Sequence, residues 1–165
     1  MNAQTPWIVP VALLLLGCGP PAGNAPGTAG GAGAPAAAAG PLDFDVGEIK
    51  TAEEYLAEPR YAQADLERGE LLSLTCRACH TWSAGEAHLL GPTLEGLFGR
   101  RSGSAPGFEY SPVLRAADII WTPRALDAWL SDPSGFMPGN NMPFAGLHSA
   151  ADRQDLLAFL LTATR

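Results

Sequence analysis

The sequence predicts an all-α fold for the C-terminal part of the chain, residues 62–165. Apolar side chains recur three and four positions apart, as at Leu126, Trp129 and Leu130, which is helical spacing. Helix-start signals precede such stretches, for example Thr122 before Pro123. No segment alternates apolar and polar residues over a useful length. The 165 residues therefore predict one helical domain of ordinary size, with additional segments before it.

The chain opens with an export leader, predicted over residues 1–17. Trp7 to Leu16 is apolar apart from Pro10, and this run is shorter than the ~18–20 residues that span a bilayer. It ends in Leu-Leu-Gly-Cys18, which resembles a bacterial lipoprotein box, where cleavage precedes a cysteine that is then lipidated. The leader lacks Lys and Arg and Leu16 is bulky for that position, so a plain cleaved signal or an uncleaved anchor stays the alternative.

Two segments separate the leader from the domain. Residues 18–41 are the predicted lipidated cysteine and a tether of Gly, Ala and Pro, which cannot bury enough apolar surface to order and is expected to be disordered. Residues 42–61 form an N-terminal extension. Thr51 and Glu54 are spaced as a capping box, and Pro59 is expected to end the helix that they start. Docking on the domain through Tyr55 and Leu56 is the alternative, but we expect this extension to be a solvated lead-in without chemistry.

The domain contains three predicted helices and informative loops. The first helix covers 62–75, with leucines at helical spacing (Leu66, Leu71, Leu72 and Leu74), and the second begins at Thr122 and stops before Pro133. The third is capped by Ser149 and presents Leu156, Phe159 and Leu160 on one face. Residues 131–146 contain three prolines and three glycines, which argue against a helix. A loop of this length is usually functional, and it carries Met137 and Met142.

The stretch Cys76-Arg-Ala-Cys-His80 carries the chemistry. Two cysteines three positions apart and followed by histidine are the attachment signature of a c-type haem. Two thioether bonds would place the next residue under the iron, where an imidazole nitrogen is a proximal ligand. A redox dithiol would need a βαβ context and a zinc site would need a second ligand pair; the one other cysteine, Cys18, is remote in sequence. The motif therefore predicts one covalent haem c.

From about Asp65 to Arg165 the chain resembles the class I, mitochondrial-type cytochrome c family and its bacterial relatives. Besides the haem motif, the matching stretches are Gly91-Pro-Thr-Leu-Glu-Gly-Leu-Phe-Gly-Arg100, Ala105-Pro-Gly-Phe-Glu-Tyr110, Ile120-Trp121, Met142-Pro-Phe-Ala-Gly-Leu147 and Asp155-Leu-Leu-Ala-Phe-Leu160. The resemblance implies a small cytochrome c fold, with helices wrapped around one covalently bound haem. It covers about 100 residues with several independent motifs.

The resemblance also implies the roles of individual residues. Cys76 and Cys79 would hold the haem, His80 would be the proximal ligand and Met142 the distal one, while Met137 would be a core residue. Further cofactor contacts fall at Pro92, whose carbonyl would face His80, at the propionate positions Arg100, Tyr110, Ser111 and Trp121, and at Trp129 and Phe144. Trp129 and Leu114 stand where the family often has tyrosine and asparagine, which removes polar contacts around the haem. His88 would be structural and His148 exposed.

Charge and motif together predict the function. The net charge is −7 and Lys50 is the one lysine, which argues against a nucleic-acid partner. We expect a monomeric electron carrier, not an enzyme, on the periplasmic side of a bacterial cell envelope and anchored to a membrane through Cys18. The implied partners are membrane redox proteins such as a quinol:cytochrome c oxidoreductase, a terminal oxidase or a dehydrogenase. The alternatives are a cytochrome subunit of a larger dehydrogenase or oxidase complex, and a haem peroxidase or gas-binding protein.

Overall fold

The structure is a computed structural model that describes residue 45 and residues 47–165. The predicted leader, Cys18 and the tether lie outside the described residues. The described part contains helices and loops, one isolated bridge between Arg101 and Ile120, and no strand, so the all-α prediction is confirmed. The helices are α1 (Ala52–Leu56), α2 (Pro59–Ala62), α3 (Leu66–Arg77), α4 (Pro112–Ala116), α5 (Pro123–Ser131), α6 (Pro133–Phe136) and α7 (Ala150–Ala163).

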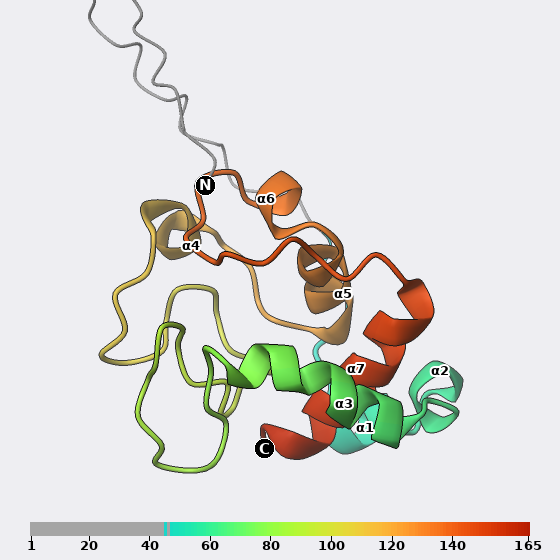
Figure 1. The fold of residues 1–165 in the computed structure, drawn as a ribbon. Helices are drawn as coiled ribbons and strands as arrows, with labels where there is room; N and C mark the ends of the chain where they lie inside the picture. The colour runs from blue at the N-terminus through green and yellow to red at the C-terminus, as the bar shows by residue number, and fades with distance from the viewer. Residues whose placement is uncertain (1–44, 46) are drawn as a thin grey trace, which may run out of the picture. The chain divides into compact units, whose positions relative to one another are not determined.

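Helices α3 and α7 form the most extensive helix–helix contact of the domain and cross each other in Figure 1. Gly69 lies at the contact, where a Cβ atom would come within 2.8 Å of the Asp155 carbonyl carbon and of the Phe159 Cβ atom. The Asp65 side chain caps α3 and the Ser149 side chain caps α7, as predicted for Ser149. The absence of a side chain at Gly69 therefore allows the two backbones to approach closely.

The buried residues of α3 are small residues and not the leucines whose spacing indicated the helix. Leu66, Leu71 and Leu74 are between 47% and 62% exposed, whereas Gly69 and Ser73 are buried. Small residues four positions apart lie on one face of a helix, and here that face meets α7. The leucine spacing indicated the helix but not its buried face, because the close α3–α7 contact excludes large side chains.

Helix α5 matches its predicted start and end. The Thr122 hydroxyl accepts a hydrogen bond from the Ala125 N–H, Pro123 occupies the first turn, and Leu126, Trp129 and Leu130 are buried. After this helix the structure differs from the prediction of a segment without helix. Pro133 opens the short helix α6, capped by the Asp132 side chain, because proline fits the first helical position.

The N-terminal extension packs on the domain, so the expectation of a solvated lead-in is wrong. Helices α1 and α2 both contact α7, and Tyr55 and Tyr61 are 6% and 4% exposed within the hydrophobic core. The predicted capping box of Thr51 is confirmed. Pro59 begins α2 instead of ending α1, which stops at Leu56. Two aromatic side chains provide the apolar area that the sequence pattern did not assign to the core.

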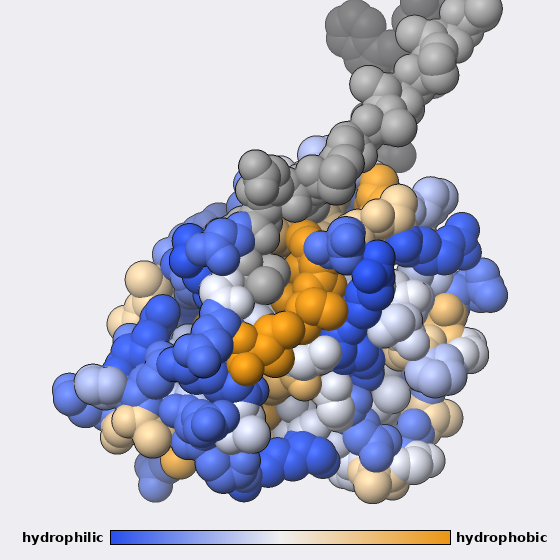
Figure 2. Space-filling model, turned by 180° about the vertical axis from the view of Figure 1, so that it is seen from behind, coloured by the Kyte–Doolittle hydropathy of each residue, from blue (hydrophilic) through white to orange (hydrophobic). Residues whose placement is uncertain are grey.

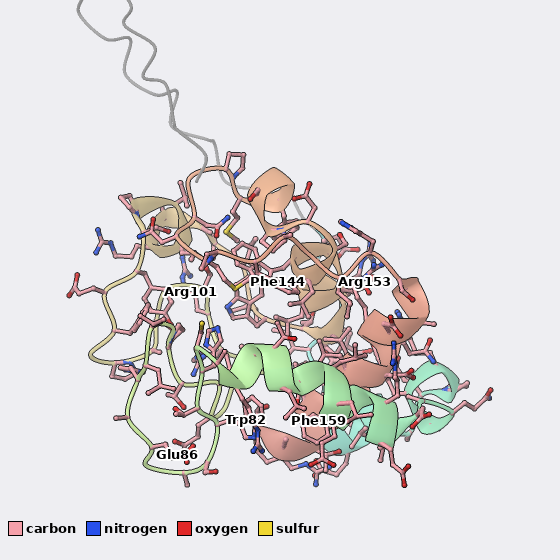
Figure 3. All side chains as sticks on the ribbon, viewed as in Figure 1. Trp82, Glu86, Arg101, Phe144, Arg153 and Phe159 are labelled. Carbon is pink, nitrogen blue, oxygen red and sulfur yellow. The ribbon has the colours of Figure 1, made fainter. Side chains whose placement is uncertain are left out.

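The segment between α6 and α7 contains no helix, and hydrogen bonds hold its C-terminal end near Leu147 and His148. The Arg153 guanidinium donates to the Leu147 and His148 carbonyls and forms a 2.8 Å ion pair with Asp127 of α5 (Figure 3). The Leu147 N–H donates to the Leu130 carbonyl. The loop therefore leaves α6 and returns to α7 along a defined path.

Elsewhere the surface mixes polar and apolar residues, and Figure 2 shows an apolar band between hydrophilic residues on the face opposite to that of Figure 1.

Candidate haem-binding site

A cavity of about 300 Å³ lies in the domain, and all eleven residues predicted to bind the haem or its iron line it. They come from the end of α3, the loops that follow it, α5 and the segment after α6. The lining residues predicted from the sequence are Cys76, Cys79, His80, Pro92, Arg100, Tyr110, Ser111, Trp121, Trp129, Met142 and Phe144. Residues up to 68 positions apart in the sequence, Cys76 and Phe144, thus meet at one site.

The two cysteines and the histidine form a compact turn at the end of α3. The Cys79 and His80 N–H groups donate to the Cys76 carbonyl at 3.0 and 2.9 Å, so the chain continues to turn beyond Arg77. Burial raises the pKa of the Cys76 thiol to about 11, which disfavours the reactive thiolate of a redox dithiol. The described residues hold no group of three or more His, Cys, Asp or Glu side chains suited to a metal.

The His80 imidazole is oriented by its neighbours. Its Nδ1 lies 2.6 Å from the Pro92 carbonyl oxygen, the contact that the resemblance implied. Burial is the main cause that lowers the pKa of His80, so the neutral ring donates from Nδ1 and has its lone pair on Nε2. A Cβ atom at Gly91 would collide with this ring. Glycine at 91 therefore leaves room for an imidazole that presents Nε2 as a ligand.

One part of the cavity wall is polar. The Arg100 guanidinium donates to the Glu95 and Thr93 carbonyls at 2.8 and 2.9 Å, and burial raises the pKa of Tyr110. The Ser111 hydroxyl oxygen is buried without a hydrogen-bond partner among the described residues. A buried hydroxyl without a partner costs free energy unless a bound group satisfies it. The carboxylates of a haem would supply that partner, so this wall fits the cofactor.

The remaining wall is aromatic and aliphatic. The rings of Trp121 and Trp129 lie 5.7 Å apart, and Phe144 projects into the interior of the domain (Figure 3). Leu114 also lines this wall, so both positions where the family has polar groups present indole or aliphatic surface. Met142 lines the cavity, whereas Met137 is 2% exposed in the hydrophobic core and does not line it, as expected. The thioether available to the cavity is that of Met142.

Sequence reasoning did not identify the aliphatic residues that complete the cavity. They come from the loop after His80, from α5 and from α7: Leu90, Leu94, Leu97, Leu126, Leu130 and Leu160. The helical stripe had indicated that Leu126, Leu130 and Leu160 are buried, but a periodic pattern does not distinguish a cavity wall from ordinary core. Together these walls fit a flat apolar group, and two thiols, one imidazole and one thioether line the same cavity.

Comparison with known proteins agrees with this geometry. Residues 66–164 match the family model for cytochrome c. The chain is 46% identical over 101 residues to cytochrome c of Chlamydomonas reinhardtii, and the aligned region covers 61% of this chain and 90% of that protein. It is 39% identical over 106 residues to cytochrome c of Stellaria longipes, a match that covers 64% of this chain and 98% of that protein. It is 42% identical over 95 residues to cytochrome c of Ulva intestinalis, a match that covers 58% of this chain and 86% of that protein. The chain therefore belongs to the cytochrome c family, and it is an electron carrier with one covalently bound haem c, not an enzyme.

Proposed function

We propose that this protein is an exported, membrane-tethered carrier that shuttles one electron between membrane-associated redox proteins. Cys76 and Cys79 form the two thioether bonds to the haem, His80 is its proximal ligand and Met142 its distal ligand. The observation that carries the ligand assignment is the convergence of these four side chains on one cavity, where the Ser111 hydroxyl has no hydrogen-bond partner among the described residues. When bound, the haem iron supplies one-electron chemistry by cycling between Fe(III) and Fe(II).

The protein residues hold the cofactor and exclude competing chemistry. Burial favours the neutral form of His80, and the Pro92 carbonyl accepts a hydrogen bond from its Nδ1–H, which fixes the tautomer that can bind a metal. Arg100, Tyr110, Ser111 and Trp121 provide hydrogen-bond donors for the propionates. Met142 would supply its thioether sulfur as the second protein ligand of the haem iron, which would hinder the binding of oxygen or peroxide. The apolar walls favour the uncharged parts of the cofactor and keep water out.

Two methionines of the same loop allow a matched test of the distal ligand. Leucine has nearly the volume of methionine but no sulfur, so Met142→Leu removes the ligand without opening a large cavity. We expect the ferric haem of this variant to become high-spin, and the ferrous form to bind carbon monoxide. Met137→Leu, in the core, is expected to keep the wild-type optical spectrum. The opposite pattern would show that the distal assignment is wrong.

Membrane tethering is supported by the leader and by the surface near the cavity. No helix in the part of the chain that the structure describes is long and apolar enough to cross a bilayer. Leu90, which lines the cavity mouth, is 84% exposed and its neighbour Leu89 is 52% exposed. A net charge of −7 with a single lysine disfavours electrostatic steering toward acidic partners. A lipid at Cys18 would replace steering with an effective concentration on the order of millimolar.

This proposal predicts docking through neutral and apolar surface at the cavity mouth. Electron transfer to partners in native membranes should depend weakly on ionic strength, because screening acts on charges. Leu90→Asn is expected to slow the transfer, whereas Leu71→Asn, an exposed leucine of α3 outside the cavity lining, is the matched control. Cys18→Ala should slow transfer greatly with an unchanged spectrum. A steep decrease in rate with added salt, or a soluble variant of equal rate, would refute the proposal.

A further inference from the structure

The side chain of Asn140 links three backbone groups of the segment that carries Met142. Its Nδ2 atom donates to the Pro133 carbonyl and to the Met137 carbonyl, both at 2.9 Å. Its Oδ1 atom accepts a hydrogen bond from the Met142 N–H at 2.8 Å. Both donors of the amide and one of its two acceptor positions are therefore used within the protein.

These bonds connect the Met142 backbone to well-buried structure. Pro133 at the start of α6 is buried, and Met137 just after α6 is 2% exposed. Met142 itself lies outside any helix, between this anchor and the one that holds Leu147 to Leu130. The amide side chain of Asn140 thus connects α6 and the residue after it to the backbone of Met142, which lines the cavity.

Asn140 does not line the cavity, although its neighbours Asn141 and Met142 do. A role for Asn140 in the site must therefore act through the backbone of the loop. A thioether is a weak ligand to iron, and its occupancy of the distal position depends on how firmly the backbone keeps the sulfur there.

We propose that Asn140 is a positioning residue that keeps Met142 in place as the distal ligand by joining its backbone to the carbonyls of Pro133 and Met137. The inference rests on the proposed role of Met142. It predicts that loss of the Asn140 amide frees the distal position for external ligands more than it lowers the stability of the whole fold.

The test is a titration of the ferric holoprotein with imidazole, followed by its optical spectrum. Imidazole binds only when Met142 leaves the iron, so its affinity reports the strength of the distal bond. Asn140→Ala is expected to raise the apparent affinity for imidazole about tenfold or more, equivalent to about 1.4 kcal/mol. Thr51→Ala, which removes the capping box of α1, is the control for a general loss of stability and should leave the affinity unchanged.

Asn140→Asp separates the link to α6 from the local bond to Met142. Aspartate keeps an oxygen that can accept the Met142 N–H but places an acceptor opposite the Pro133 and Met137 carbonyls. We expect it to raise imidazole affinity as Asn140→Ala does. Wild-type affinity in Asn140→Asp, or equal affinities in Asn140→Ala and Thr51→Ala, would overturn the inference.

Met142→Leu distinguishes failure of this inference from failure of the proposed ligand. If Met142→Leu binds imidazole no better than the wild type, the distal assignment itself is wrong. If Met142→Leu binds it tightly while both Asn140 variants behave as the wild type, Met142 is the ligand and Asn140 does not position it.

Discussion

The contact between α3 and α7 allows a stability prediction to be worked out from the structure. Gly69→Ala would place a methyl carbon 2.8 Å from the Asp155 carbonyl carbon and 2.8 Å from the Phe159 Cβ atom, and closer still to the Asp155 carbonyl oxygen. Carbon atoms pack best at about 3.5–4.0 Å. Two of the three atoms belong to the α7 backbone and the third is bonded to it, so no side-chain rotation relieves the contact. The two helices have to separate by about 1 Å.

The expected magnitude is the difference between two opposing effects. Overpacking of a close contact costs about 1–3 kcal/mol, and a rigid backbone partner places this case near 3 kcal/mol. Replacing glycine by alanine inside a helix returns about 1 kcal/mol. The net loss in the free energy of unfolding is therefore about 2 kcal/mol. For a domain of this size each kcal/mol lowers the melting temperature by about 4–8 °C, so a decrease of about 8–16 °C is expected.

Thermal unfolding of the oxidised holoprotein, followed by far-ultraviolet circular dichroism, measures this decrease. Glu70→Ala is the matched control, because it changes the next residue of the same helix at an exposed position. The control should melt within a few degrees of the wild type. A Gly69→Ala variant that melts higher than the wild type would mean that only helix propensity changed, and that α3 and α7 do not approach as closely as described.

Three further predictions address the extension, the cofactor and the proximal histidine. Burial raises the pKa of Tyr61 from 10.0 to about 12, so between these pH values the folded state keeps a proton that the unfolded state loses. The free energy of unfolding should therefore decrease as the pH rises from 10 to 12. Denaturant titrations of Tyr61→Phe should show a smaller decrease over this interval. Cys76→Ser combined with Cys79→Ser should give an apoprotein without a cooperative thermal transition, because a domain of this size has a marginal core once its central group is absent; a sharp calorimetric transition would contradict this. Gly91→Ala should displace the His80 ring and weaken proximal ligation, seen as a high-spin fraction in the ferric spectrum, whereas an unaltered spectrum would contradict the close contact.

Several features followed from the sequence alone because the interactions behind them are local. The caps at Thr51, Thr122 and Ser149 join a side chain to an N–H group three positions later, so nearby residues suffice to predict them. The Cys76–His80 motif is equally local, because its spacing is set by the chemistry of haem attachment. Met142 was selected over Met137 through resemblance, since both methionines precede a proline in the same loop.

Only the tertiary structure decided which surfaces are buried. The leucines of α3 have helical spacing, yet Gly69 and Ser73 are its buried residues and Gly69 meets α7, because a helix contact depends on how closely the partner backbone approaches. Tyr55 and Tyr61 belong to the core because α7 offers them an apolar surface far away in sequence.

The link from Asn140 to Met142 was also beyond the sequence. An asparagine in a loop rich in proline and glycine predicts a turn, and nothing in the pattern shows which carbonyls its amide will meet. In the fold, α6 presents the carbonyls of Pro133 and Met137 to that amide. The Cys76–His80 motif was therefore predicted from residue types and spacing, and Met142 from resemblance, whereas packing decided the side chain that we propose to position Met142.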